Sequence, residues 1–289
     1  MTRAAPVDNQ RGAVLLVVAA GIFTADVTVL RYLGPNVHFE QIIFFRSLLQ
    51  LVIVALWIRM QRGLTFGSTR WRMLVVRGLT SLVCWWLYYA SFQALELALA
   101  STLTFTTSLF VVVMAPFVLG ERIGMRRGLT TVIGFIGVVL ASGATGLSVK
   151  PGVWLGLGSA FAAAILIFQN RVLARTEQTA TIMFWIGLVA TLGTAPGAIV
   201  SWTAISLWDL AILVLAGSLA TLGMLMTVEA YRYGEVSALA PFPYARILFA
   251  LGAGYVLFSE TINLAEMFGA GIIIVCGLMA NPRRRQPVP

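Results

Sequence analysis

The chain alternates between ten long apolar stretches and short segments that hold most of its charged residues. Each stretch has about twenty residues, the length that an α-helix needs to cross a bilayer core about 30 Å thick. Because a spanning segment must satisfy its own backbone hydrogen bonds, the pattern predicts an all-α polytopic membrane protein. The expected spans are 13–32, 41–59, 73–93, 98–119, 128–147, 152–172, 180–200, 206–228, 236–258 and 264–280.

One segment of this pattern occurs twice. Residues 94–121 and 233–260 align without a gap at an offset of 139 positions. Each copy opens near an acidic residue, passes through small residues into about twenty apolar positions, and closes with Glu121 or Glu260. The alignment indicates an internal repeat.

Counting spans extends the repeat to the whole chain, with a first half at 1–147 and a second half at 148–289. Each half holds five spans. Because five is an odd number, the second half enters the membrane from the opposite side, which predicts two inverted five-helix repeats. In transporters built this way, the solute binds near the bilayer midplane at the repeat interface.

The basic residues lie unequally on the two sides of these spans. The loops on one side hold fifteen arginines, whereas the other side holds only Arg31 and Lys150. Since cytoplasmic loops carry an excess of Lys and Arg, we expect both termini in the cytoplasm. The fifteen are Arg3, Arg11, Arg59, Arg62, Arg70, Arg72, Arg122, Arg126, Arg127, Arg171, Arg175, Arg232, Arg283, Arg284 and Arg285.

Composition supports the membrane assignment. Of the 289 residues, 59% are hydrophobic and only 11% are charged, too few to cover the surface of a soluble domain of this size. The net charge of +9 reflects basic loops between spans, which membrane orientation explains better than nucleic-acid binding. Cys84 and Cys276 lie inside spans, so we expect free thiols.

The sequence gives no sign of catalysis. Its one histidine, His38, falls in an expected loop, and neither a metal-spaced cluster nor a phosphate-binding glycine loop is found. We therefore expect no enzyme, no cofactor and no metal site. The expected partners are a small-molecule solute and the lipid bilayer.

The ten spans, the two five-span halves and the span endings Gly120-Glu121 and Ser259-Glu260 resemble the drug/metabolite transporter superfamily. More narrowly, they resemble its EamA family of ten-helix bacterial exporters, although Ser259 stands where glycine is usual. The resemblance implies export of amino acids and other small metabolites across the inner membrane, and one branch is similar to the aromatic amino acid exporters. It does not fix the substrate.

Arg246 is the deepest charged candidate, roughly 15 Å from the start of its span at 1.5 Å per residue. Pro241 and Pro243 precede it and interrupt the backbone hydrogen bonding. The repeat-equivalent residue, Thr107, lies in a hydroxyl-rich run. One interpretation is a cavity in which Arg246 attracts a substrate carboxylate; the other is that Arg246 only caps freed carbonyls or pairs with a buried group.

Aromatic residues complete the expected substrate-binding set. Trp85 and Trp86 are adjacent and point about 100° apart on a helix, so at most one should line the cavity fully. A tryptophan in the cavity wall would stack on apolar or aromatic solutes. The alternative is that both tryptophans only pack against neighbouring helices. Tyr244 and Phe105 are further candidates.

Other polar residues in the spans are expected to be structural or to act in gating. Asp26 and Arg46 are expected at the same depth below the outer membrane surface, on adjacent spans. This predicts an ion pair or an outer gate. Glu121 and Glu260 are expected to cap or gate the span ends. Interfacial positions are expected for four other residues, with Arg77 extending to the headgroups, Tyr88 in the aromatic belt, and Gln169 and Asn170 at an inner span end.

The functional hypotheses belong to different classes. The first is a broad exporter of amino acids, including aromatic and apolar ones, by alternating access. The second is a transporter of a nucleotide-like solute such as S-adenosylmethionine, to which the Phe44–Arg46 stretch shows some resemblance. Such a solute should need more midplane polar groups than Arg246 and a threonine run provide. A non-transporting scaffold is the third. We expect flux down the solute gradient without an obligatory proton, with proton exchange through Asp26 as the alternative.

Overall fold

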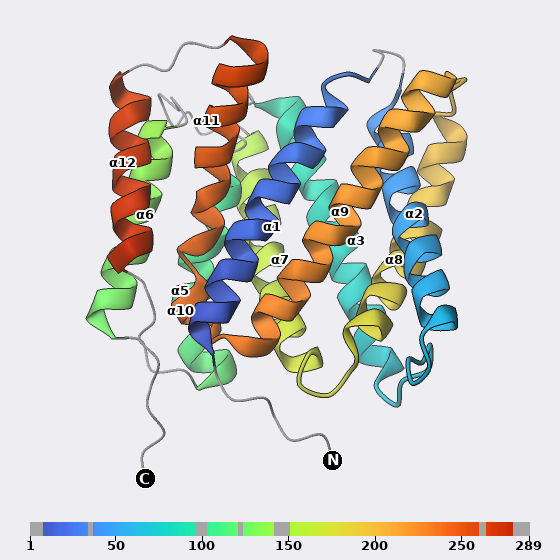
Figure 1. The fold of residues 1–289 in the computed structure, drawn as a ribbon, viewed down its shortest axis with the longest axis horizontal. Coiled ribbons are helices and arrows are strands. Elements are labelled where there is room, and N and C mark those ends of the chain that lie inside the picture. Colours follow the sequence, from blue (N-terminus) through green and yellow to red (C-terminus); the bar gives the residue numbers. More distant parts are fainter. Residues whose placement is uncertain are drawn as a thin grey trace.

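A computed structural model describes residues 8–33, 37–95, 103–120, 124–141, 151–259 and 264–279, and its elements are all helical (Figure 1). Among these residues, six helices are long and apolar enough to cross a membrane, counting the interrupted segment Val236–Leu257 as one. The elements are α1 (Asn9–Leu30), α2 (Phe39–Met60), α3 (Trp71–Ala94), α5 (Thr107–Leu119), α6 (Met125–Ala141), α7 (Pro151–Leu173), α8 (Thr179–Val200), α9 (Leu207–Tyr233), α10 (Val236–Leu239), the 3₁₀ turn η1 (Phe242–Tyr244), α11 (Ala245–Phe258) and α12 (Leu264–Met279).

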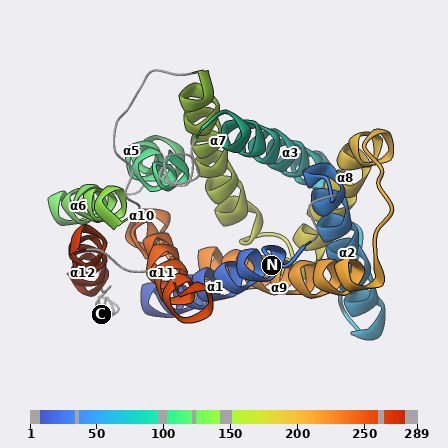
Figure 2. The same cartoon turned by 90° about the horizontal axis from the view of Figure 1, so that it is seen from above.

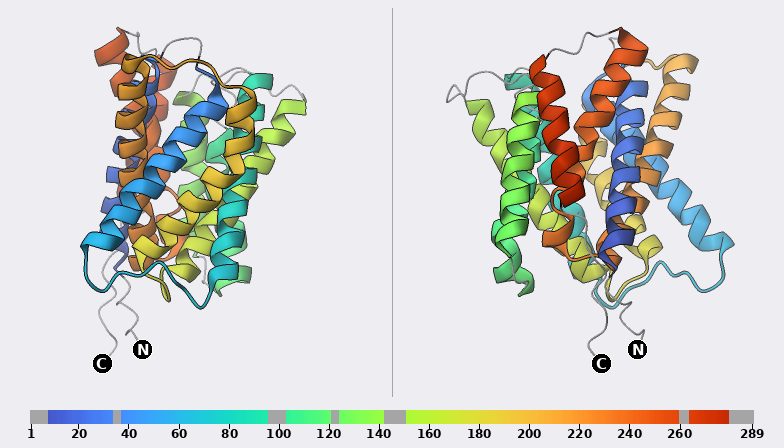
Figure 3. Two further views of the ribbon diagram at one scale, coloured as in Figure 1. Left: turned by 90° about the vertical axis from the view of Figure 1, so that its right-hand side faces the viewer. Right: turned by 60° about the vertical axis from the view of Figure 1, so that its left-hand side comes forward.

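These helices coincide with the ten expected spans, so the all-α prediction is confirmed. Helix α1 begins and α12 ends at the same end of the bundle (Figures 1 and 3). We call this the basic end, because α2, α7 and α9 also finish there with Arg59, Arg171 and Arg232.

Helix packing follows the two-fold relation of an inverted repeat. Helix α1 packs against α9 as its counterpart α7 packs against α3, and α2 contacts α9 as α8 contacts α3. The α2–α8 and α6–α12 pairs join each helix to its own counterpart. Seen from above, α6 and α12 lie together at one edge of the molecule, while α1, α2, α3, α7, α8 and α9 form the larger part (Figure 2).

The fourth helix of each half is interrupted near the middle. In the second half, α10 stops at Leu239, and the chain continues through η1 before α11 begins at Ala245. Pro241 and Pro243 fall inside this break, because a proline ring provides no backbone N–H for the helical ladder. In the first half, a helical turn at 103–105 leads into α5 through Thr106.

The two interrupted helices also end alike. Gly120 follows α5 with φ 65°, and Ser259, at the equivalent position 139 residues later, follows α11 with φ 53°. A left-handed residue commonly terminates a helix, and glycine adopts that conformation without a steric penalty. Serine holds the same conformation at some cost, so the repeat has kept the geometry while changing the residue.

Glycines let α7 and α8 approach their neighbours closely, because a glycine adds no side chain to the contact. A Cβ on Gly156 would stand 2.8 Å from Leu103 Cδ1 and 2.9 Å from Ser91 Oγ. One on Gly193 would stand 2.2 Å from Leu82 Cδ1. Cys84 and Cys276 are both free cysteines, as expected.

Candidate solute-binding site

The expected ion pair between Asp26 and Arg46 is present. Arg46 Nη2 donates to Asp26 Oδ2 at 2.5 Å, and the Asp26 side chain is only 1% exposed. The second carboxylate oxygen, Oδ1, is buried and has no hydrogen-bond partner in the described part of the chain. An unmatched buried carboxylate oxygen costs free energy, so this atom is a natural acceptor for a cationic group of a bound solute.

An aromatic side chain covers this ion pair. The Arg46 guanidinium carbon lies 5.8 Å from the centroid of the Trp85 ring, within the range of a cation–π interaction. Trp85 meets the ring of Tyr88 edge to face, with centroids 6.0 Å apart. Trp86 is 69% exposed, so of the two adjacent tryptophans only Trp85 lies at the ion pair.

Tyr88 is not confined to an interfacial belt, which corrects the expectation for it. Besides meeting Trp85, it lies within electrostatic range of Asp26, Arg46 and Arg246. Its position follows from the helical repeat, because residues three apart on α3 share a face.

Arg246 stands at the start of α11, directly after the interrupted segment. The Thr24 hydroxyl donates to its carbonyl oxygen at 3.5 Å, which connects α11 to α1. Its charge lies within electrostatic range of Asp26 and of Tyr88. The guanidinium itself makes no hydrogen bond or ion pair within the described residues, so it is available to an anionic group.

A cavity of about 70 Å³ adjoins the ion pair between α1, α2, α3, α8 and α9. It holds Arg46 and Trp85 in its wall together with three polar residues that were not among the sequence candidates, namely Ser47, Gln50 and Ser81. The remaining wall is apolar or small: Phe23, Ile43, Leu82, Ile186, Gly187, Ala190, Ala220 and Met224.

Arg77 is buried, which corrects the expectation that it reaches the headgroups. It is 2% exposed, its Nε donates to Asn170 Oδ1 at 2.9 Å, and its Nη1 donates to Ser81. Asn170 is therefore buried as well, and Gln169 donates to Thr80 at 3.2 Å. Arg77 points toward α7 because Asn170 supplies an acceptor there at the same depth.

Tyr244 and Phe105 pack in the core. Tyr244 is fully buried, its hydroxyl donates to the Thr131 carbonyl at 3.3 Å, and its ring meets that of Phe105 edge to face. The Thr107 hydroxyl donates to the Thr104 carbonyl at 2.7 Å, so it supports the break in its own helix. The structure does not place these three side chains with Arg46 and Trp85.

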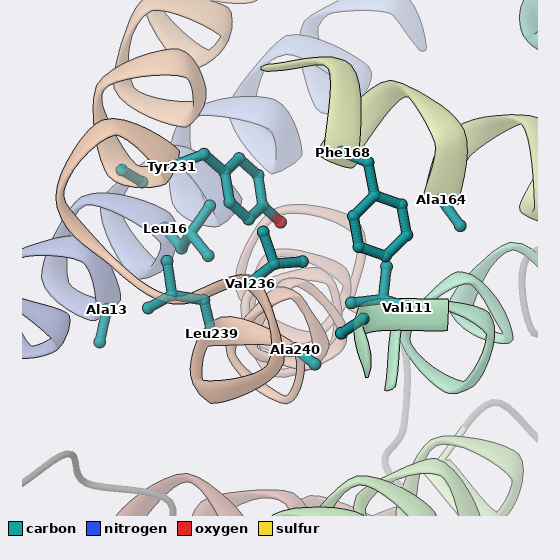
Figure 4. Close-up of a cluster of buried hydrophobic side chains, with 11 residues drawn as sticks. Ala13, Leu16, Val111, Ala164, Phe168, Tyr231, Val236, Leu239 and Ala240 are labelled. Atoms are coloured by element: carbon teal, nitrogen blue, oxygen red, sulfur yellow. The ribbon is translucent and has the colours of Figure 1, made fainter. Parts of the chain in front are cut away.

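At the basic end the bundle is closed by an apolar cluster (Figure 4). Phe168 and Tyr231 face each other across Val236, and Leu239 packs beneath them. The cluster draws side chains from α1, α5, α7, α9 and α10, so it joins elements of both halves.

An ion pair below the cluster links the two halves, and we call it the Arg127–Glu235 lock. Arg127, on α6, lies 2.7 Å from the Glu235 carboxylate and donates to the Ser237 hydroxyl at 3.1 Å. The Glu235 amide donates to Asn9 Oδ1 at 2.6 Å, which adds α1 to the same contact.

Two sequence candidates and one boundary lie outside the described residues. The two candidates are Glu121 and Glu260, and the boundary is the expected division between residues 147 and 148.

An inverted helical repeat, a broken helix, and a cavity beside a buried ion pair are features of membrane transporters of small solutes. The chain belongs to the EamA-like transporter family, whose model matches residues 10–143 and 150–281. It is a multi-pass membrane protein and not an enzyme.

Relatives with named substrates are distant. The S-adenosylmethionine uptake transporter of Rickettsia bellii (strain RML369-C) is 25% identical over 253 residues, covering 87% of this chain and 86% of the relative. The pseudopaline exporter CntI of Pseudomonas aeruginosa (strain UCBPP-PA14) is 27% identical over 285 residues, covering 95% and 97%. A solved crystal structure superposes with a TM-score of 0.78 at 16% identity, covering 94% of this chain and 96% of the other, which supports the fold alone.

Proposed function

We propose that this protein carries S-adenosylmethionine, or a solute with the same groups, across the bacterial inner membrane with both termini in the cytoplasm. The observation that carries the proposal is the Asp26–Arg46 pair, which has an unmatched Asp26 oxygen, the Trp85 ring over Arg46, and the Arg246 charge within electrostatic range of Asp26. Together these groups offer a cation, an anion and an aromatic surface.

S-adenosylmethionine has a partner for each of them. Its carboxylate suits the Arg246 guanidinium, since charge-assisted hydrogen bonds are the strong ones. Its ammonium group suits Asp26 Oδ1, and its adenine ring offers a flat face to Trp85. The Rickettsia relatives named as S-adenosylmethionine uptake transporters support this choice.

The sequence-based objection to such a solute was the small number of polar groups at mid-depth. Gln50 and Ser81 add polar groups to the cavity wall beside Arg46. A nucleotide-like solute therefore finds more hydrogen-bonding partners than Arg246 and the threonine run alone would give it.

Amino acids remain the second candidate, because the same Arg246 and Asp26 groups would bind their carboxylate and ammonium. The two candidate solutes differ in whether they carry an adenine ring. An amino acid exporter needs no partner for adenine, whereas a carrier of S-adenosylmethionine should discriminate against free methionine.

Counterflow into proteoliposomes tests the proposal. Vesicles loaded with unlabelled S-adenosylmethionine should accumulate labelled S-adenosylmethionine, and free methionine should compete poorly. Arg246→Ala should weaken apparent affinity roughly ten- to a hundredfold, the effect of losing a charged hydrogen bond worth about 1.5–3 kcal/mol. Arg126→Ala, an exposed arginine on α6, is the matched control. Accumulation of phenylalanine or methionine without S-adenosylmethionine would favour the amino acid reading.

A further inference from the structure

A donor and an acceptor line the cavity beside the ion pair. Gln50 follows Arg46 by four residues on α2, and Ser81 precedes Trp85 by four residues on α3. Residues four apart share a helix face. Both polar side chains line the same cavity as the ion-pair arginine and the tryptophan.

Gln50 presents an acceptor. Its amide nitrogen Nε2 donates to the Met183 carbonyl at 2.9 Å. Because that neighbour can only accept, the orientation of the amide is determined, and the carbonyl oxygen Oε1 takes the other position. Within the described residues, no donor reaches Oε1.

Ser81 presents a donor. Arg77 donates to its hydroxyl oxygen, and arginine has no acceptor to offer in return. The hydroxyl hydrogen of Ser81 therefore points elsewhere, and it finds no acceptor among the described residues. The charge of Arg77 polarises this hydroxyl and makes it a stronger donor.

The walls around these two groups suit a flat ring. Phe23 and Trp85 supply aromatic surface, and Gly187, Ala190 and Ala220 are small residues in the same wall. The cavity of about 70 Å³ is smaller than the roughly 150 Å³ that accepts a benzene molecule. It therefore takes only the polar edge of a ring, and the remainder of the ring lies outside it.

We propose that this cavity is a specificity subsite for adenine, in which the exocyclic amino group donates to Gln50 Oε1 and a ring nitrogen accepts from the Ser81 hydroxyl. The inference rests on the proposed function, because it assigns the ring of the transported solute. A hypoxanthine ring carries a carbonyl oxygen where adenine has its amino group, so it would set two acceptors against each other at Gln50. The subsite should reject it.

Equilibrium dialysis of the purified protein with labelled adenosine, with inosine as competitor, tests the subsite directly. We expect inosine to compete about tenfold less well than adenosine, because the buried Gln50 oxygen would lose its donor and face a second acceptor. Gln50→Leu should abolish the preference, and Ser81→Ala should weaken adenosine binding severalfold. Gln61→Leu and Ser218→Ala, which lie outside the cavity, are the matched controls, and thermal unfolding confirms that each variant is folded.

Counterflow separates this inference from the proposed function. Adenosine binding that depends on Gln50, without transport of S-adenosylmethionine, would leave the subsite standing and reject the proposed solute. Transport of S-adenosylmethionine and its inosine analogue at equal apparent affinity would overturn the subsite and leave the proposed function standing. Equal binding of adenosine and inosine by the unaltered protein would also overturn it. The Ser81→Ala variant decides the question if Gln50→Leu fails to fold.

Discussion

The Arg127–Glu235 lock should hold the basic end of the bundle closed, and removing it should shift the protein toward a state open at that end. The pair joins the first half to the second, and the two halves must rock against each other for alternating access. Arg127→Gln keeps a long polar side chain but removes the charge, so it tests the ion pair with little change in volume.

The magnitude follows from the exposure of the pair. The two side chains are 31% and 24% exposed, and they are 2.7 Å apart. A fully exposed pair contributes about 0.2–1 kcal/mol, and a hydrogen bond to a charged group about 1.5–3 kcal/mol. Between these limits, about 1–2 kcal/mol is expected, which shifts the equilibrium between closed and open states roughly 5- to 30-fold.

Cysteine accessibility can measure this shift. Ala240 belongs to the apolar cluster and is 3% exposed, so Ala240→Cys should react slowly with a maleimide while the basic end is closed. After replacement of Cys84 and Cys276, we expect labelling in detergent to accelerate about tenfold in Arg127→Gln. The charge-swapped Arg127→Glu/Glu235→Arg variant should return to the slow rate.

Arg126→Gln provides the control, because this neighbouring arginine is exposed. If Arg127→Gln labels no faster than Arg126→Gln, the ion pair does not hold the basic end closed. The apolar cluster alone would then be responsible, and the reasoning about the lock would be refuted.

Four further outcomes are expected. Gly78→Ala should lower the melting temperature, with an overpacking cost of about 1–3 kcal/mol, because its Cβ would stand 2.5 Å from Val189 Cβ; Gly67→Ala, with open space around it, should not. Ser259→Gly should raise the melting temperature slightly, since glycine adopts φ 53° without strain, and an unchanged or lower value would contradict this. Trp85→Ala should weaken binding of ring-bearing solutes more than of small ones, and an equal loss would indicate simple packing. Solute flux in sealed liposomes should persist with equal pH on both sides and a protonophore present; its collapse would favour proton exchange through Asp26.

Most of the fold could be predicted because membrane solubility leaves few choices. Runs of about twenty apolar residues can satisfy their backbone in a bilayer only as helices, and the 139-residue offset already predicted the equivalent helix endings at Gly120 and Ser259. The ion pair between Asp26 and Arg46 followed from matching depth on adjacent helices. These features are local or periodic, so the sequence contains them directly.

The residues that were misjudged depend on partners distant in sequence. Arg77 was assigned by depth alone, but Asn170 on α7 draws it inward. Tyr244, a substrate-binding candidate from the sequence, packs against Gly134, where a Cβ would stand 2.8 Å from its ring. Neither partner can be identified from the local pattern.

A usable signal was nevertheless present for the cavity. Arg77, Ser81 and Trp85 recur at intervals of four residues, and Arg46 and Gln50 do the same on α2. Residues at this interval face one way on a helix. The shared helix faces therefore predict that Gln50 and Ser81 lie with Arg46 and Trp85.

The interrupted fourth helix of the second half gives the site a physical link to the lock. Glu235 and Ser237 of the lock lie at the start of α10, and Arg246 lies at the start of α11. Between them, Pro241 and Pro243 remove two backbone donors, so no continuous hydrogen-bond ladder makes α10 and α11 one rigid rod. We therefore expect a solute carboxylate bound by Arg246 to displace α11 while α10 remains in the lock. Tyr244 of η1 donates a hydrogen bond to α6, and α6 also carries Arg127 of the lock. We expect a displacement of α11 to release the lock only if it is passed on through η1 to α6.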